Sequence, residues 1–268
     1  MQARVASLFV FPVKACAALP VQELVFTADG RLQGDREWAV VDAGSQVTWQ
    51  GEYPRLACVM PSFDGSTLVL QASGEETVRL PREGGEAPLR ICIWNDAMQR
   101  TEHFDALDAG PAAAALLRRV TGADLRLVRL GAEALARSGT NALHLLSQAS
   151  LDELDEALHA RGLAAAEARR FRPNLVLEGD DLAPFLEEHL TRLRWSGGEL
   201  RATSRCVRCI VPNVDPRDGA LGAEPGPTVA ALSTMRWPGA PSTLGLYARP
   251  VGVGVLARGT LLDLELAL

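Results

Sequence analysis

The sequence of 268 residues is poor in lysine and tyrosine. Its 27 basic residues comprise one lysine, Lys14, and 26 arginines. A chain with so strong a bias keeps a lysine by chance, or where a compact ammonium does what a planar guanidinium cannot. Tyrosine occurs only as Tyr53 and Tyr247. The places where these few residues fall are therefore worth following along the chain.

Long apolar runs, a surplus of positive charge and an even set of cysteines are missing as well. No run approaches the roughly 20 apolar residues of a membrane helix, so we expect no membrane span. The net charge of −6 gives no support to a nucleic-acid partner, because binding phosphates needs a surplus of Lys and Arg. Five cysteines in a long chain predict no disulfide framework.

The N-terminus has one feature of a secretory signal, an apolar stretch over Val5–Phe11 followed by small residues at 15–18. Pro12 and Lys14 interrupt it where a signal peptide would have an unbroken apolar core. We therefore predict a cytoplasmic protein. A hydrophobic content of 47% with 22% charged residues is typical of a soluble globular enzyme with one large core or two modest ones.

Short apolar or alternating segments fill the first hundred residues and predict β-strands. These segments are Val5–Phe11, Val21–Phe26, Trp38–Val41, Val47–Trp49, Leu68–Gln71, Thr77–Leu80 and Leu89–Trp94. The Gly, Asp and Pro residues between them favour a barrel or a rolled sheet. A helix is expected over Ala113–Val120, with Gly122 as its end.

The rest of the chain mixes strands and helices. Strands are expected at Leu125–Leu130, Ala142–Leu146, Leu175–Leu177, Leu193–Trp195, Glu199–Thr203, Val251–Leu256 and Leu261–Leu266. Ser147 or Ser150 caps a helix, which the Ala- and Arg-rich run 160–170 is expected to continue. The whole predicts a β-rich α+β fold, with one β-barrel-like domain over residues 1–122 and a second domain over 123–268.

The sharpest local signal is a Cys-x-x-Cys pair, Cys206 and Cys209, flanked by Arg205 and Arg208. Structural zinc would need a second pair, and the other cysteines are scattered. A thioredoxin-like dithiol would begin a long helix, which the nearby prolines forbid. Two buried inert cysteines are the ordinary alternative. The remaining interpretation is a thiolate ligand to a soft metal, since the arginines favour the thiolate.

Four weaker patterns lie elsewhere in the chain. In Phe171–Asn174 the proline predicts an extended Arg172, whose guanidinium could bind a phosphate. A position on a solvated edge is the more ordinary one for an arginine. Lys14 ends the first strand. Gly139–Asn141 precedes a buried strand, and Gly245–Tyr247 lies near the C-terminus.

Taken in order, these patterns resemble the MOSC superfamily, and within it the mitochondrial amidoxime-reducing components and their bacterial relatives. The family's Tyr-Pro-Val-Lys-Ser-Cys, Asp-Arg-x-Trp and Pro-Arg-Leu elements are similar to Phe11–Cys16, Asp35–Trp38 and Pro54–Leu56. Its Thr-Ser-Pro to Ser-Leu element resembles Thr140–Leu151, and its Phe-Arg-Pro-Asn element resembles Phe171–Asn174. Its Cys-Ser-Arg-Cys-Ile to Asp-Pro element resembles Cys206–Pro216, and its Phe-Gly-x-Tyr element resembles Leu244–Tyr247. The resemblance covers nearly the whole chain.

The resemblance implies a set of cofactor-binding residues. Cys209 would ligate molybdenum, which the dithiolene of a pterin also holds. Lys14, Arg172 and Arg208 would contact the phosphate or the pterin. The other cofactor positions that the resemblance implies are Ala15, Gln50, Thr140, Asn141, Asn174, Val207 and Tyr247. The only lysine and one of the two tyrosines thus fall on cofactor positions, and a phosphate-bearing cofactor requires cations.

The resemblance also implies an activity and a fold. The activity is that of an oxidoreductase dependent on the molybdenum cofactor (Mo-molybdopterin), which reduces amidoximes, hydroxylamines and hydroxylated bases to amines. The fold is an N-terminal β-barrel-like domain packed on a MOSC β-barrel domain with peripheral helices. Because the sequence has no ferredoxin-like cysteine cluster, we expect a separate flavin or iron–sulfur reductase to donate electrons. The alternative is a cofactor-binding or sulfur-carrier module like that of molybdenum-cofactor sulfurases, although no pyridoxal-phosphate domain is attached.

The sequence departs from the family pattern on the N-terminal side of the expected pocket. Ala15 stands where the family has serine, Gln50 where it has arginine, and one extra residue precedes Pro54. This predicts a looser pocket there. Trp49 could stack on the pterin, although a tryptophan in the core is the more ordinary role. His144 could face the pocket, although a structural histidine is the more ordinary role.

Overall fold

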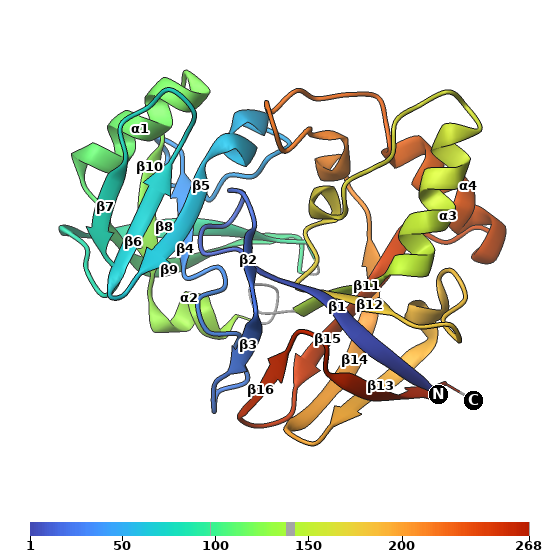
Figure 1. Ribbon diagram of the computed structural model, residues 1–268. Helices are drawn as coiled ribbons and strands as arrows, with labels where there is room; N and C mark the ends of the chain where they lie inside the picture. Colours follow the sequence, from blue (N-terminus) through green and yellow to red (C-terminus); the bar gives the residue numbers. More distant parts are fainter. Residues whose placement is uncertain (97, 138–142, 268) are drawn as a thin grey trace.

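Seven strands close into a barrel in the computed structural model, which describes residues 1–96, 98–137 and 143–267 (Figure 1). In order around the barrel they are β12 (Leu175–Glu178), β11 (Leu143–Ser147), β15 (Thr243–Pro250), β14 (Gly198–Val207), β13 (Leu190–Trp195), β17 (Leu261–Leu266) and β1 (Gln2–Val10). β1 then pairs with β12 and closes the ring. β2 (Leu19–Val21) extends the sheet beside β1. The strands predicted at Leu193–Trp195 and Glu199–Thr203 are confirmed, and they form the hairpin β13–β14.

Leucine side chains fill the inside of this barrel. Leu145, Leu175, Leu193 and Leu200 have no exposed surface. Successive side chains of a strand point to opposite faces, so the alternating burial along β1 lays one face on this core. Burial of each such leucine contributes roughly 1.5–3 kcal/mol. The barrel therefore provides a firm base for residues at its strand ends.

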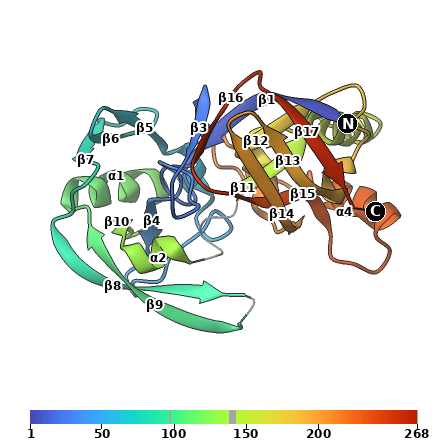
Figure 2. The ribbon, with the colours of Figure 1, turned by 90° about the horizontal axis from the view of Figure 1, so that it is seen from below.

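Three smaller sheets accompany the barrel; the first two named below form the other half of the molecule, and the third packs on the barrel core. They are β4 (Trp38–Val41), β10 (Arg126–Leu130), β9 (Arg100–Asp108) and β8 (Ala87–Asn95); β5 (Met60–Asp64), β6 (Thr67–Gln71) and β7 (Val78–Pro81); and β3 (Glu23–Phe26) with β16 (Gly254–Ala257). Figure 2 shows β8 and β9 as a long hairpin at the edge of this half. The predicted β-rich α+β fold, with a barrel and peripheral helices, is confirmed.

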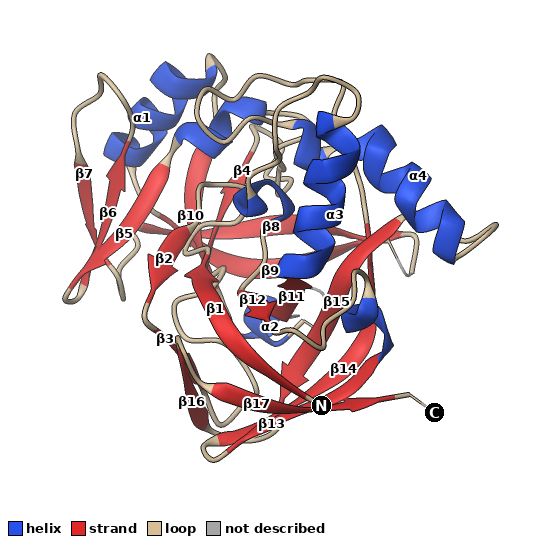
Figure 3. Ribbon diagram, turned by 45° about the vertical axis from the view of Figure 1, so that its right-hand side comes forward, coloured by secondary structure: helices blue, strands red, loops and turns tan. Residues whose placement is uncertain are grey.

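The helices cover the sheets from outside (Figure 3). They are α1 (Pro111–Thr121), α2 (Ala132–Ala136), α3 (Gln148–His159) and α4 (Gly226–Arg236), with short 3₁₀ turns η1 (Pro54–Cys58), η2 (Ala168–Phe171), η3 (Leu186–His189) and η4 (Val211–Asn213). Gly122 ends α1 in a left-handed conformation, as predicted. The hydroxyl of Ser147 caps α3, accepting from the Ser150 N–H at 3.1 Å. No helix in the described ranges is long and apolar enough to cross a membrane.

Two predicted elements are wrong. The run 160–170 does not continue α3, because Gly162 is left-handed and Asp155 accepts the backbone N–H of Ala166 at 2.7 Å, which turns the chain back. Val47–Trp49 is no strand, since only an isolated bridge joins Val47 to Val41. The domain boundary near residue 122 stays a prediction; β1, from the N-terminus, pairs with strands of the barrel.

Gly245 in β15 sits where a side chain has no room. Its φ is +86°, and a Cβ there would lie 2.5 Å from the Leu145 carbonyl oxygen and 2.6 Å from Nε2 of His144. A left-handed conformation favours glycine, and the close neighbours exclude any larger residue. The glycine thus lets β15 pass close to His144 on β11.

Replacing Gly245 with alanine should lower the free energy of unfolding by about 3 kcal/mol or more, because backbone strain and a clash with backbone act together. Gly259→Ala is the matched control, since Gly259 has a φ of +83° with nothing within 4 Å. The control should cost about 1–2 kcal/mol. Urea denaturation measures both; equal losses would contradict the close packing described for Gly245.

Candidate functional site

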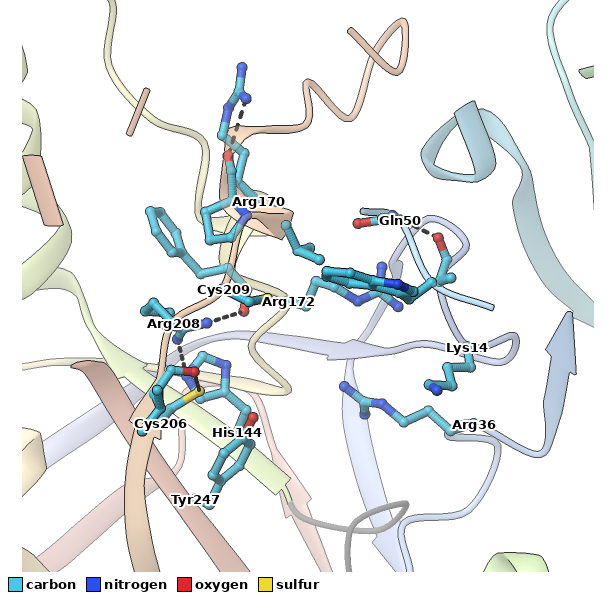
Figure 4. Close-up of a pocket in the computed structure, with 16 residues that line it drawn as sticks. Lys14, Arg36, Gln50, His144, Arg170, Arg172, Cys206, Arg208, Cys209 and Tyr247 are labelled. Atoms are coloured by element: carbon cyan, nitrogen blue, oxygen red, sulfur yellow. Dashed lines mark hydrogen bonds between the residues drawn. The ribbon is translucent and has the colours of Figure 1, made fainter. Parts of the chain in front are cut away.

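A cavity of about 210 Å³ lies where the barrel meets the N-terminal half (Figure 4). Its described lining comes from the chain after β1, from the segments around Arg36 and Trp49, from η2 and η4, and from β11, β14 and β15 with the residues that follow β14. The residues are Lys14, Ala15, Arg36, Trp49, Gln50, His144, Arg170, Phe171, Arg172, Cys206, Val207, Arg208, Cys209, Val211, Pro212 and Tyr247. The cavity thus joins segments from both ends of the sequence.

The two cysteines of the Cys-x-x-Cys pair are in different environments. Cys206, on β14, is 1% exposed, whereas Cys209 is exposed in the turn that leads to η4. The pairing of β14 with β15 shifts register between Arg205 and Val207, and such a shift re-aims side chains at a strand end. Of the two thiols, only that of Cys209 is open to a ligand arriving from solvent. All five cysteines are free.

The lining is strongly positive although the chain is acidic. Five of the described lining residues are cationic, and none of the described lining residues is acidic. Arg170 is compensated from behind, since it pairs with Asp215 at 2.6 Å and donates to the Val214 carbonyl at 3.0 Å. Arg36 pairs with Asp35, which does not line the cavity. Arg172 and Arg208 have carbonyl, aromatic or imidazole partners. A site of this kind attracts an anion.

Arg172 is not extended, contrary to the prediction. Its φ of 56° is left-handed, because the residue ends η2 and the following proline disfavours a right-handed helical conformation. Nη1 donates to the Cys16 carbonyl, while Nη2 is buried without a hydrogen-bond partner among the described atoms. Burial lowers the pKa of Arg172 to about 9, with Arg36 as the next cause, so the guanidinium stays charged at neutral pH. An unpartnered buried donor is costly and indicates a site for a ligand.

Arg36 also lines the cavity and was not among the predicted site residues. It too is left-handed, with a φ of 52°, and it pairs with the buried carboxylate of Asp35. The guanidinium groups of Arg36 and Arg172 lie 5.0 and 4.2 Å from the centre of the Phe11 ring, close enough for cation–π attraction. The Asp35–Trp38 element pointed to this region, but the contact depends on packing against Phe11.

His144 connects two of the predicted arginines. Arg208 Nη2 donates to His144 Nε2 at 2.6 Å, and the Arg172 carbonyl accepts a hydrogen bond from the imidazole. Burial, and next the charge of Arg208, hold the pKa of His144 well below its usual range. The ring is therefore neutral at pH 7, which allows it to accept from an arginine. His144 is structural, as expected, and it also lines the cavity.

Lys14 has no hydrogen-bond or ion-pair partner for its ammonium in the part of the chain that the structure describes. Burial lowers the pKa of Lys14 to about 8, and the nearby charges of Arg137, Arg36 and Arg172 act in the same direction. Figure 4 shows Lys14 and Arg36 on one side of the cavity, with Arg208, His144 and Cys206 on the other. An anion between the two groups would meet positive charge from both sides.

Two of the departures from the family pattern contact each other. Gln50 Nε2 donates to the Ala15 carbonyl at 2.7 Å, and Ala15 is left-handed with a φ of 71°. Gln50 is buried, so its amide holds this strained turn in place. The two residues build the cavity wall without adding charge to it.

Asn174 lies behind the cavity. Its amide nitrogen donates to the Phe9 carbonyl at 3.0 Å and to the Asp35 carboxylate at 3.1 Å. Its amide oxygen accepts from the backbone N–H of His144 at 3.2 Å and from the Arg36 guanidinium at 3.4 Å. Those contacts use the whole capacity of an asparagine side chain. Asn174 therefore positions Arg36 and His144, and its direct contact with a cofactor stays a prediction.

Most of the predicted site residues come together. Those that line the cavity are Lys14, Ala15, Gln50, Arg172, Val207, Arg208, Cys209 and Tyr247. Thr140 and Asn141 lie outside the described residues. Arg36, Arg170 and His144 join the lining although the sequence did not predict them as binding residues. Tyr247 shares a side-chain hydrogen bond with Cys206, and its burial raises the pKa of the phenol.

Comparison with known proteins gives the family context of this cavity. The sequence matches the MOSC N-terminal beta barrel domain over residues 2–124 and the MOSC domain over residues 118–262. It is 29% identical over 238 residues to mitochondrial amidoxime-reducing component 1 of Homo sapiens, covering 81% of this chain and 68% of that protein. Mitochondrial amidoxime reducing component 2 of Homo sapiens is 26% identical, with the same shares covered.

A second group of relatives carries a different name. The chain is 29% identical over 240 residues to molybdenum cofactor sulfurase of Drosophila willistoni, a match that covers 87% of this chain. The chain spans only 30% of the length of that sulfurase. One group of relatives is thus named for the reduction of amidoximes, and the other for the molybdenum cofactor.

The charge state of Lys14 can be measured directly, because it is the only lysine in the chain. Protein labelled with ¹³C at lysine Cε should show one lysine signal, titrating near pH 8 as burial and neighbouring arginines predict. The ammonium is thus present below that pH and is lost as the pH rises through it. Removing a neighbouring charge in Arg172→Gln should move the midpoint upward. A midpoint near the usual value of about 10.4 would contradict the crowding of cations.

Proposed function

We propose that this chain, which belongs to the MOSC family by its match over residues 118–262, is a molybdenum-cofactor-dependent reductase. Its substrates would be amidoximes, hydroxylamines and hydroxylated bases, which it would convert to amines. The observation that carries the proposal is the exposed thiol of Cys209 in a cavity lined by cations within an acidic chain. The thiol suits a metal, and the cations suit an anion.

The residues of the cavity fit a pterin cofactor that carries a phosphate and a soft metal. The phosphate would meet the buried, unpartnered Nη2 of Arg172 and the ammonium of Lys14. The metal would bind the thiolate of Cys209, since thiolates are the ligands that soft metals prefer. Arg36 and Arg208 would add charge on opposite sides of the cavity. No carboxylate of the described lining competes with the phosphate.

Each residue then has a definite task. When bound, the cofactor supplies the two-electron chemistry that removes the hydroxyl oxygen from nitrogen. Cys209 holds the metal, the cations hold the rest of the cofactor, and neutral His144 keeps Arg208 in position. The overall reaction consumes two electrons and two protons and releases one water. With its pKa near 8, the Nζ of Lys14 can hold or release a proton close to neutral pH.

We further propose that the electrons come from a separate flavin or iron–sulfur reductase, and that the protein acts in the cytoplasm. The human relatives differ in this respect, since their names place them in mitochondria.

Replacement of the two cysteines should separate their roles. Cys209→Ser should remove most of the bound molybdenum and the activity, because the exposed thiolate is the metal ligand. The Cys206→Ser variant should keep the metal, since Cys206 is buried and hydrogen-bonded to Tyr247. Elemental analysis of the two purified variants is the measurement. Equal loss of metal from both would indicate a shared zinc or dithiol site instead.

A carrier of cofactor or sulfur is the second candidate, favoured by the relatives named molybdenum cofactor sulfurase. A reductase keeps its cofactor through many turnovers, whereas a carrier must release its cargo. We therefore expect cofactor-loaded protein with a chemical electron donor to reduce benzamidoxime repeatedly, with each protein molecule forming many molecules of benzamidine.

The matched measurement incubates the same loaded protein with a cofactor-free molybdenum enzyme. Retention of molybdenum on this chain, together with repeated turnover, supports the reductase. Release of cofactor to the acceptor, without reduction of any N-hydroxylated compound, would establish the carrier and refute the reductase.

A further inference from the structure

Trp49 differs from the other aromatic residues of the cavity in its exposure. It is 40% exposed, whereas Phe171 is 2% exposed and Tyr247 is half-buried. The core position that is ordinary for a tryptophan is therefore not the one that the structure shows. A large exposed aromatic group in a cavity wall is costly in water and is typical of a surface that contacts a ligand.

The exposed residues of the described lining mark the mouth of the cavity. They are Trp49, Val207 and Cys209. The mouth therefore combines two apolar side chains with the thiol proposed as metal ligand. The charges suited to a phosphate lie deeper, since Arg172 Nη2 is buried. A ligand that contacts Trp49 would therefore lie at the mouth, apart from the buried Nη2 of Arg172.

The indole is placed by the backbone next to it. A Cβ on Gly51 would lie under 3.0 Å from three atoms of the Trp49 ring, so the ring packs closely over this glycine. No hydrogen bond within the described ranges holds the indole nitrogen. The ring can occupy this place because Gly51 has no side chain. Gly51 lies in the segment that departs from the family pattern by one extra residue.

We propose that the indole of Trp49 is a platform on which a flat aromatic substrate lies beside Cys209. This rests on the proposed function and adds a specificity to it: aromatic N-hydroxylated compounds are preferred over small aliphatic ones. Aromatic pairs attract each other beyond their buried area, by an amount equivalent to roughly two- to twelvefold in affinity. A small aliphatic substrate has no ring and gains nothing from this contact.

The test compares benzamidoxime with acetamidoxime, both uncharged at neutral pH. Calorimetry on oxidised, molybdenum-loaded protein without an electron donor measures binding in the absence of turnover. Trp49→Ala should weaken benzamidoxime binding about five- to tenfold and leave acetamidoxime binding unchanged, and Trp49→Phe should restore most of the loss. Gly51→Ala should act like Trp49→Ala, because it displaces the ring without removing it.

Trp94→Ala is the matched control, since Trp94 is 46% exposed and does not line the cavity. It should leave both affinities unchanged. Equal weakening of both ligands in Trp49→Ala would overturn the proposal. So would loss of molybdenum from Trp49→Ala, which would place the indole against the pterin instead.

The binding test is independent of turnover, so failure of either proposal can be recognised. Wild-type protein that binds benzamidoxime through Trp49 but never reduces it would refute the reductase and keep the platform. Turnover of both compounds, with unchanged benzamidoxime affinity in Trp49→Ala, would keep the reductase and refute the platform.

Discussion

Repulsion among the cations of the cavity is the force that the surrounding structure must balance. Lys14, Arg36, Arg172 and Arg208 line a space of about 210 Å³, and like charges this close oppose folding. Carboxylates would neutralise the arginines, but they would also remove the attraction for an anion. The described structure places two carboxylates behind the lining, Asp35 at Arg36 and Asp215 at Arg170. For the rest the protein relies on partners without charge.

These uncharged partners explain otherwise odd features of the fold. The Phe11 ring contacts the guanidinium groups of Arg36 and Arg172. Backbone carbonyls of Leu244 and Phe171 accept from Arg208 at 2.9 and 3.1 Å. His144 can accept from Arg208 only because its ring is neutral. Each partner orients a cation while leaving its charge available inside the cavity.

Three residues around the cavity have a left-handed backbone although none is glycine. They are Ala15, Arg36 and Arg172. Such conformations cost about 1–3 kcal/mol each and persist where the surroundings fix them. Hydrogen bonds and an ion pair fix two of them. Gln50 donates to the Ala15 carbonyl, while Arg36 pairs with Asp35 and donates to Asn174. The strain thus lies where the side chains must converge.

The sequence predicts what depends on neighbours along the chain and misses what depends on distant contacts. Apolar alternation indicates the barrel strands, and the Ser147 cap and the Gly122 stop are local signals that the structure confirms. The placement of the Arg172 guanidinium could not be predicted in this way, because the carbonyl that accepts from it belongs to Cys16, 156 positions away. The His144–Arg208 contact joins β11 to the residue that follows β14, 64 positions further along the chain. Family motifs led to the cavity, but not to the network behind it.

Three residues that depart from the family pattern share the N-terminal wall of the cavity, while Val207, which stands where the family has serine, lies on the barrel side. Ala15, Trp49 and Gln50 all lie on the N-terminal side, whereas Cys209, Arg208 and Tyr247 on the barrel side match the motifs. Gln50 removes a charge but supports the Ala15 turn, so the wall keeps its shape while it becomes less polar. The groups proposed to hold the metal and the anion would serve a reductase and a carrier equally. What distinguishes this chain must then depend on the altered wall, where Trp49 meets solvent.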